Sequence, residues 1–332
     1  MSGVVPARGA DALREIQAPV RARLDVVTTE MHGIVSADLP MIAEVSGHLL
    51  RMRGKLFRPT LVLLASSVEG RSEQRAVRVG AVVELMHLAT LVHDDSIDHS
   101  VLRRGLPTVN SLFSHEVSVI MGDFLYARAL IGLVQLQDLE LVRILTEVTN
   151  QLTIGEMRQL AAVDALSFTE AEYGELIRAK TAALIAAACE TGALCGAPQH
   201  REQLRRYGER LGMAFQVADD ILDYTEDQSV TGKPSGNDLR EHKVTLPLIA
   251  ALPNVSPAAR VKIDELFATA GPSDELIADV VSIVTDAGGI EYARRRGEQF
   301  AREAEEALSA VPEGPVRVAL TDTISYVMDR RW

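Results

Sequence analysis

Two clusters of aspartates in this chain share one spacing. The first cluster contains Asp94, Asp95 and Asp98, and the second contains Asp219, Asp220 and Asp223. Residues four apart lie on the same face of a helix, so each cluster would present two carboxylates side by side. Like charges at this spacing destabilise a helix by about 0.2–0.5 kcal/mol per pair. The repeated pattern therefore indicates that a positively charged group binds at both clusters.

A divalent cation would compensate this repulsion. Apolar residues flank both clusters, so the carboxylates are expected near the protein interior, where an uncompensated charge is very costly. Magnesium suits the pattern, because it accepts one or two carboxylates and completes its coordination with water and phosphate oxygens. A solvated acidic helix end would explain one cluster alone about equally well. Two clusters with the same spacing favour a magnesium site that acts on diphosphate esters.

Basic residues supply the other half of such a site. Lys55 and Arg58 precede a predicted helix, and Arg103 and Arg104 follow the first aspartate cluster. The segment around Lys55 is not a phosphate-binding P-loop, because the upstream glycine and the hydroxyl residue after the lysine are absent. Arginine side chains bind phosphate through two parallel hydrogen bonds. Each pair alone could be a solvated surface feature, but beside the aspartates they predict sites for two anionic ligands.

Helical periodicity surrounds these motifs. Apolar residues recur with a period near 3.6 along residues 73–95, and residues 117–136 are apolar nearly all round. The second segment is expected to be buried in a large bundle, or else to form an interface. Further helices are expected at residues 138–164, 170–195, 200–224, 239–251, 257–270, 273–287, 289–311 and 314–330. No alternating strand run is evident, so we predict an all-α fold with one large helical bundle domain at residues 11–332, after a disordered tail at residues 1–10.

The composition limits the partners and the compartment. The chain has 332 residues, of which 47% are hydrophobic and 4% aromatic, and its formal net charge is −12. This charge argues against nucleic acid as a partner. Cys189 and Cys195 are expected to be buried free thiols, which suits a cytoplasmic protein. We identify neither a signal peptide nor an apolar run near the ~20 residues that cross a bilayer.

One predicted loop interrupts the helices. Residues 225–243 lack periodicity, and they are polar and rich in glycine. Loops of this length inside a compact domain are more often functional than idle, and a lid over a ligand is one such role. The terminal residues 330–332 could also cover the site, or they could fray.

In this order and spacing, the motifs resemble those of the trans-isoprenyl diphosphate synthases, also called polyprenyl diphosphate synthases. The matching stretches are GKLFRP (54–59), ELMHLATLVHDDSIDHSVLRRGLPT (84–108), GD (122–123), GEMRQ (155–159), KT (180–181), GMAFQVADDILDY (212–224), GKP (232–234) and GNDLREHKVTLPL (236–248). The resemblance implies the isoprenoid synthase type of helical bundle, a homodimer, and condensation of isopentenyl diphosphate with an allylic diphosphate. The sequence departs from the family at His242, where many members have glycine, and we expect an altered loop geometry there.

The resemblance also implies a role for each matching residue. About three Mg²⁺ ions would bind principally to Asp94, Asp98 and Asp219, with Asp95, Asp220 and Asp223 supporting them directly or through water. The allylic diphosphate would bind to Arg103, Lys180, Lys233 and Lys243, and isopentenyl diphosphate to Lys55, Arg58, His87 and Arg104. Thr181 and Gln216 would lie beside the allylic carbon, where their dipoles can stabilise a carbocation. The residues expected to act directly in catalysis are Asp94, Asp98, Arg103, Lys180, Thr181, Gln216, Asp219, Lys233 and Lys243.

The implied chemistry explains why these residue types are needed. Breaking the allylic C–O bond leaves a delocalised cation and a diphosphate with additional negative charge, which metal ions and basic side chains stabilise. The double bond of isopentenyl diphosphate would then attack the cation, and the released diphosphate would accept the proton. No side-chain nucleophile is required.

Several single residues keep a second interpretation. His87 could be an ordinary core histidine, and Lys180 could extend outward along its helix. Glu156 and Gln159 could support the site or be merely structural. Asp123 lies in an apolar helix and therefore must be paired, with a group that the sequence does not identify.

The helical turn before the first cluster bears on product length. Ala89 and Thr90 precede Asp94 by about 6–7.5 Å along the helix, and Thr90 should line the tunnel for the prenyl tail. Members of the family that make short products place a bulky aromatic residue here. The small side chains predict a product longer than C15, although Met86, one turn deeper, could form a floor. The final length stays open between about C20 and C40 or more.

Other proteins could use the same motifs. A non-catalytic subunit of a heteromeric synthase is expected to have lost an aspartate cluster or the allylic cations, and this chain retains them. A terpene cyclase or a squalene-type synthase has no use for Lys55, Arg58 and Arg104. A catalytic or non-catalytic subunit of a heteromeric synthase and a short-chain C15 or C20 synthase remain alternatives, and the primer and the pathway stay open.

Overall fold

Helices make up most of the structure, because alanine, leucine and other helix-forming residues fill most segments. A computed structural model describes residues 8–52, 54–70, 74–161, 165–225 and 236–329. Its α-helices are α1 (Arg8–Gln17), α2 (Arg21–Ile34), α3 (Pro40–Arg51), α4 (Phe57–Ala65), α5 (Gln74–Ile97), α6 (Val109–Leu112), α7 (His115–Val134), α8 (Leu139–Ala161), α9 (Glu170–Ile177), α10 (Ala183–Gly196), α11 (Arg201–Thr225), α13 (Asn237–Arg240), α14 (Leu246–Ala251), α15 (Pro257–Ala268), α16 (Asp274–Asp286), α17 (Gly289–Ala307) and α18 (Pro315–Met328). Since α1 begins at Arg8, the last residues of the predicted disordered tail are helical.

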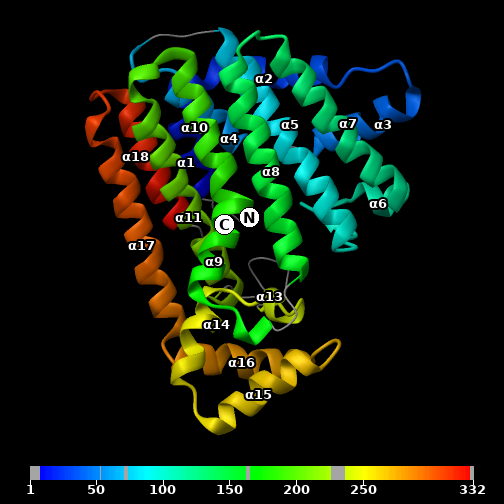
Figure 1. The fold of residues 1–332 in the computed structure, drawn as a ribbon, viewed down its shortest axis with the longest axis vertical. Coiled ribbons are helices and arrows are strands. Elements are labelled where there is room, and N and C mark those ends of the chain that lie inside the picture. Colours follow the sequence, from blue (N-terminus) through cyan, green and yellow to red (C-terminus); the bar gives the residue numbers. More distant parts are fainter. Residues whose placement is uncertain (1–7, 53, 71–73, 162–164, 226–235, 330–332) are drawn as a thin grey trace, which may run out of the picture.

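The long helices form an upright bundle, and two shorter helices cross its lower end (Figure 1). α11 packs against α10 and α17, while α5 packs against α7 and α4. The main hydrophobic core includes the fully buried Leu64, Met86 and Tyr207. A second core, which includes Leu239 and Leu266, joins the lower end of α11 to α13, α15 and α16. The motif-bearing ends of α5 and α11 therefore lie between two packed regions.

Some helices begin at a defined side-chain cap. Ser114 accepts a hydrogen bond from the amide of Val117 at the start of α7, at 3.2 Å. Thr169 and Glu172 form a reciprocal capping box at the start of α9. A cap of this kind satisfies amides that the first turn leaves unpaired, and it contributes about 1 kcal/mol. The start of α9, which borders the candidate site, is thus fixed by its own sequence.

Three local elements differ from the sequence-based prediction. The helix expected at residues 170–195 is divided into α9, a π-helix at Arg178–Ala182, and α10. The helix expected at residues 239–251 is replaced by the short helices α13 and α14 with a turn between them. Two-residue strands, β1 (Leu102–Arg103) and β2 (Leu106–Pro107), form a hairpin just after α5. Apolar periodicity did not reveal these breaks because each one involves only a few residues.

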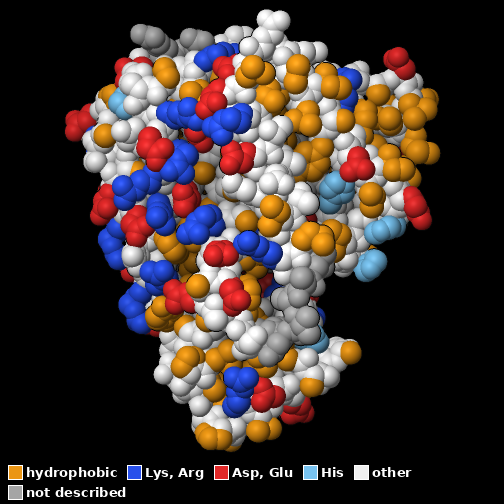
Figure 2. Space-filling model, viewed as in Figure 1, with side chains coloured by type: hydrophobic (Ala, Val, Ile, Leu, Met, Phe, Trp, Pro, Cys, Tyr) orange, Lys and Arg blue, Asp and Glu red, His pale blue; other side chains and the backbone are white. Residues whose placement is uncertain are grey.

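The prediction that residues 117–136 form a buried helix is wrong for this chain taken alone. α7 lies at the edge of the bundle, where Ile120 is 64% exposed, Ile131 49% and Val134 59%. Figure 2 shows apolar side chains gathered on the face over α7, α6 and α3. α5 and α7 each also contain an apolar window of the length that crosses a membrane, so the expectation that no run is long enough was too strict. The window in α5 is 72% buried inside the protein and that in α7 is 39% buried.

Asp123 does not need the buried partner that its apolar helix suggested. Its side chain is 72% exposed, and its carboxylate lies 3.4 Å from Nε2 of His93. A Cβ atom on the preceding Gly122 would collide with the His93 ring. Gly122 therefore provides the space in which His93 packs against α7.

Candidate active site

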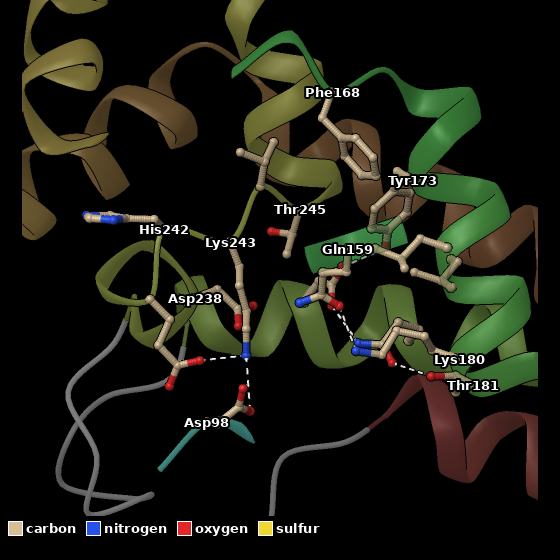
Figure 3. Close-up of a pocket in the computed structure, with 16 residues that line it drawn as sticks. Asp98, Gln159, Phe168, Tyr173, Lys180, Thr181, Asp238, His242, Lys243 and Thr245 are labelled. Atoms are coloured by element: carbon tan, nitrogen blue, oxygen red, sulfur yellow. Dashed lines mark hydrogen bonds and ion pairs between the residues drawn. The ribbon is translucent and has the colours of Figure 1, made fainter. Parts of the chain in front are cut away.

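The two aspartate clusters lie at the ends of α5 and α11, beside a cavity of about 620 Å³ (Figure 3). Asp98 lines this cavity from the end of α5, and Asp220 lines it from α11. Lys180, Thr181, Gln216 and Lys243 also line it, from the π-helix, from α11 and from the turn after α13. The structure thus brings together six residues that the sequence predicted for one site.

The first wall of the cavity combines carboxylates with basic side chains. Burial, together with the neighbouring carboxylate of Glu156, raises the pKa of Asp94 to about 6. Asp95 is buried, and its Oδ1 accepts a hydrogen bond of 2.7 Å from Nε of Arg103. Asp98 is exposed, and its Oδ2 lies 4.0 Å from Nζ of Lys243. Arg103, which the sequence predicted to bind the allylic diphosphate, is therefore paired with Asp95 in this structure.

The second wall is more deeply buried. Oδ2 of Asp220 accepts a hydrogen bond of 2.5 Å from the hydroxyl of Tyr173, and Oδ1 accepts one of 2.8 Å from the amide of Gln216. Gln216 in turn accepts a hydrogen bond of 2.8 Å from the hydroxyl of Thr181. Burial raises the pKa of Asp220 to about 8. Its neighbours fix Asp220 in place without supplying a positive charge.

Asp223 binds to the backbone of the neighbouring turn. Its two carboxylate oxygens accept hydrogen bonds from the amides of Asn237 and Asp238, at 3.1 and 2.9 Å. A carboxylate at the start of a short helix satisfies amides that would otherwise be unpaired. Asp223 therefore joins α11 to α13, and this bond brings Asp238 to the cavity. Burial and the charge of Asp223 raise the pKa of Asp238 to about 7.

Lys180 is directed toward the cavity, which excludes the outward orientation in this structure (Figure 3). Its Nζ lies 2.8 Å from Oε1 of Glu156 and donates a hydrogen bond of 2.6 Å to Oε1 of Gln159. Glu156 and Gln159, which the sequence left between two roles, thus bind the lysine predicted to hold the allylic diphosphate. The π-helix adds a residue to the helical turn, and π-helical turns frequently occur at functional sites.

A second group of predicted residues lies beside a small cavity that is bordered by α2, α5 and the segment before α4. His87 and Arg104 line it together with Glu84 and Gly54. Arg104 donates a hydrogen bond of 2.8 Å to the carbonyl of Met52, and a Cβ atom on Gly54 would lie only 2.6 Å from Nη1 of Arg104. A side chain at the glycine of the GKLFRP motif would therefore displace the guanidinium group of Arg104.

The charges of this second group affect one another. Burial lowers the pKa of His87 well below its usual range, and the charges of Arg58 and Arg104 lower it further, so His87 is neutral at pH 7. Burial raises the pKa of Glu84, and the positive charges of the same two arginines partly offset this increase. Oε2 of Glu84 is buried without a hydrogen-bond partner among the described residues. Nζ of Lys55 donates a hydrogen bond of 3.3 Å to the hydroxyl of a tyrosine in α18, Tyr326.

Some predicted residues stay untested. Lys233 and residues 330–332 lie outside the described residues. Met86 and Ala89 are fully buried, and the hydroxyl of Thr90 donates a hydrogen bond of 2.7 Å to the carbonyl of His87. Neither of the two cavities described above is lined by these three residues, so the tunnel for a prenyl tail remains a prediction.

The expectation of an altered loop geometry at His242, relative to family members with glycine there, stays a prediction. The φ angle of His242 is 55°, which is the left-handed conformation that glycine adopts readily. Such a backbone conformation is uncommon for a residue with a Cβ atom. Its side chain makes contacts of its own, described below.

Four residues with evident contacts in the site were not predicted: Glu84, Tyr173, Asp238 and Tyr326. Tyr173 precedes Lys180 by seven residues, which is two helical turns and therefore the same face. Asp238 lies inside the GNDLREHK motif, and the sequence predicted no role for it. These positions could have been found from spacing, whereas the contact of Lys55 with Tyr326 spans 271 residues.

The carboxylates fit a metal ion that is held largely by its substrate. Among the described residues, no three carboxylate, imidazole or thiolate side chains gather closely enough to hold an ion alone. Magnesium is commonly bound by one or two carboxylates, with phosphate oxygens and water completing its coordination. Burial is the main cause of the raised pKa values of Asp94 and Asp220, and a bound cation would favour their charged forms. The fold and this site define an all-α protein whose acidic clusters could bind a polyanionic ligand through divalent cations.

Comparison with known proteins identifies the family. The family model described as Polyprenyl synthetase matches residues 39–284. The chain belongs to the polyprenyl synthetase family, and it is a prenyltransferase. It is 38% identical to an all-trans-nonaprenyl-diphosphate synthase (geranyl-diphosphate specific) of Rhodobacter capsulatus, with 96% of this chain and 98% of that protein covered.

Solved structures agree with this assignment. The chain resembles the crystal structure of a decaprenyl diphosphate synthase from Rhodobacter capsulatus with a TM-score of 0.90 and 33% identity, covering 96% of this chain and 99% of that one. It also resembles a polyprenyl synthase from Caulobacter crescentus, solved with calcium and isoprenyl diphosphate, with a TM-score of 0.90, 31% identity, and coverage of 96% and 98%. These relatives confirm the predicted fold class and the predicted family.

Proposed function

We propose that this chain is a magnesium-dependent trans-prenyl diphosphate synthase. It would add isopentenyl diphosphate head-to-tail to an allylic diphosphate and form products longer than C15. The observation that carries the proposal is the cavity between the two aspartate clusters, into which Lys180 and Lys243 project (Figure 3). A separate group of basic side chains lies beside His87, which suits a second diphosphate.

In the first step, the allylic C–O bond breaks. Lys180 and Lys243 are placed to neutralise the diphosphate as it leaves, and each is already held by acidic or amide groups that a diphosphate could replace. When bound at the aspartates, Mg²⁺ would supply further positive charge to the leaving group. The amide and hydroxyl dipoles of Gln216 and Thr181, which hydrogen-bond to each other, lie beside the same cavity and suit a cationic carbon.

In the second step, isopentenyl diphosphate attacks the allylic cation. Arg58 and Arg104 would hold its diphosphate, with Lys55 beside them. A neutral His87 can donate one hydrogen bond to the diphosphate without adding a further charge beside two arginines. The diphosphate released in the first step would accept the proton that the condensed product loses.

A product assay tests this function. Purified chain would be incubated with Mg²⁺, isopentenyl diphosphate and geranyl, farnesyl or geranylgeranyl diphosphate, and the products sized. We propose geranyl diphosphate as the first primer to try, because a relative of 38% identity is named for it. We expect metal-dependent consumption of isopentenyl diphosphate and products longer than C15. Failure of the chain alone, with activity restored by a second protein, would instead indicate a subunit of a heteromeric synthase.

We also propose that the enzyme is a cytoplasmic homodimer. Ile120, Ile131 and Val134 of α7 are exposed, and Figure 2 shows apolar side chains gathered over α7, α6 and α3, a kind of surface that often marks an interface. Replacing Ile120 by aspartate should produce monomers in light scattering, whereas replacing the exposed Val261 on α15 should leave the dimer intact. Monomeric wild-type chain at micromolar concentration would exclude the homodimer.

A further inference from the structure

The turn that carries Lys243 is held from two sides. On the α11 side, Asp223 binds the amides of Asn237 and Asp238. On the opposite side, Nη2 of Arg240 lies 2.7 Å from the carboxylate of Asp274 in α16. His242, which precedes Lys243, faces the same lower pair of helices, α15 and α16.

The two neighbouring side chains point in different directions. In Figure 3, Lys243 points toward Asp98, whereas the ring of His242 points away from it. Nε2 of His242 lies 3.1 Å from the carbonyl oxygen of Thr269, just after α15, and as the N–H tautomer it donates a hydrogen bond there. The ring centroid of His242 also lies 5.6 Å from that of Phe267 in α15. His242 therefore connects the turn to the end of α15.

We propose that His242 is a positioning residue for Lys243. A residue with a Cβ atom adopts a positive φ reluctantly, so the left-handed turn at His242 depends on contacts that hold it. The hydrogen bond to Thr269 and the ring contact with Phe267 are the side-chain contacts observed for His242. A glycine at this position would adopt the same backbone conformation, but it would leave the turn without a bond to α15.

The position of Lys243 matters because its ammonium group has two acidic neighbours. Nζ lies 2.6 Å from Glu241 and 4.0 Å from Asp98. Glu241 moves with the turn, whereas Asp98 belongs to the opposite wall. A turn fixed by His242 keeps the ammonium group within reach of the first aspartate cluster, where the allylic diphosphate is proposed to bind. Small displacements of such a group cost binding and rate.

The inference rests on the proposed function and sharpens it. The residues proposed to bind isopentenyl diphosphate lie beside the cavity bordered by α2, α5 and the segment before α4, and no residue of the turn lines that cavity. Loss of the His242 ring should therefore weaken the binding of the allylic substrate while leaving isopentenyl diphosphate unaffected. Such a selective effect separates positioning of Lys243 from a general loss of stability.

The test compares His242→Gly with a matched control. Gln137 also has a positive φ, of 53°, and is exposed between α7 and α8, so Gln137→Gly makes the same backbone change away from the cavity. We expect His242→Gly to raise the KM for the allylic diphosphate about fivefold, the size of one lost hydrogen bond, with the KM for isopentenyl diphosphate unchanged. Gln137→Gly should change neither value. His242→Asn, which tolerates the left-handed conformation and retains a donor, should recover part of the loss.

Two results would overturn the proposal. One is an unchanged KM for the allylic diphosphate in His242→Gly, and the other is an equal rise in both KM values. If the wild-type chain does not condense prenyl diphosphates at all, the proposed function fails, and the binding of inorganic diphosphate with Mg²⁺ in a calorimeter then tests the positioning. A loss of affinity of about fivefold in His242→Gly alone would support it, and equal affinity in both proteins would exclude it.

Discussion

The two aspartate clusters have the same spacing but different surroundings. In the first cluster, Asp95 is bound to the guanidinium of Arg103, and Asp98 is exposed near Lys243. In the second cluster, Asp220 is buried, and its hydrogen-bond donors among the described residues are the neutral Tyr173 and Gln216. Identical spacing therefore does not mean identical roles. The first wall can exchange charged partners with a ligand, while the second presents a fixed carboxylate that gains a charged partner only when a cation binds.

The largest expected effect is the loss of a metal-binding aspartate. Asp219→Ala should lower kcat by about 10²- to 10³-fold, the usual result of removing one charge-stabilising group from an active site. Asp123→Ala provides the control, since its exposed carboxylate lies outside the cavity. Steady-state kinetics at saturating Mg²⁺ measure both. Activity of Asp219→Ala within tenfold of wild type would remove the second cluster from the metal site.

The second prediction compares Tyr173, which binds Asp220 in the second cluster, with Arg103, which binds Asp95 in the first. Tyr173→Phe removes the hydroxyl that fixes Asp220, and changes of this type typically cost about 10- to 100-fold in metal affinity or activity. The loss should appear as a raised Mg²⁺ requirement, because the tyrosine acts through Asp220. Arg103→Ala should instead raise the KM for the allylic diphosphate. The distinction between the walls fails if the two variants show the same dependence on Mg²⁺ and on substrate.

The third prediction concerns the turn of α5 that precedes the first aspartate cluster. Thr90→Phe places a bulky ring one turn before Asp94 and should shorten the products, with turnover reduced only about twofold to tenfold. Gel or chromatographic sizing of the products measures this change. Thr285→Phe, at an exposed position of α16 that is remote from α5, serves as the control. Unchanged chain lengths in Thr90→Phe would contradict the predicted tunnel.

The smallest effect is on stability. Asp94, Asp220 and Asp238 have pKa values raised to about 6, about 8 and about 7, so the folded protein holds protons that the unfolded chain has released. Stability of the metal-free protein should therefore fall as pH rises from about 4 to about 8. Thermal melts should show a decline of a few degrees. Asp220→Asn should reduce the upper part of this decline, and Mg²⁺ with diphosphate should oppose it in the wild type.

Much of the fold and of the site could be predicted from the sequence because the features are local. The helices follow from periodicity, and the shared face of Asp94 and Asp98 follows from their spacing. The exposed face of α7 could not be predicted, because all-round apolarity does not distinguish a central helix from one that meets a second molecule. The bond between Tyr173 and Asp220 depends on the packing of α9 against α11, across 47 residues of sequence.

The π-helix and His242 illustrate two further limits. The π-helix at Arg178–Ala182 arises where the chain passes α8 and α11, and apolar periodicity continues through it with little change. At His242, the sequence could not indicate the contacts of the ring with Thr269 and Phe267, because packing brings these segments together from more than twenty residues away.

The contact of Lys55 with Tyr326 has a consequence for how the protein is made. Lys55 is synthesised early, whereas Tyr326 lies in α18, the last helix described, which packs against α1 and α4. A nascent chain on the ribosome can therefore form both aspartate clusters before the proposed isopentenyl diphosphate site is complete. Lys55 gains this contact only after α18 has emerged and docked, so incomplete chains would lack this part of the proposed site.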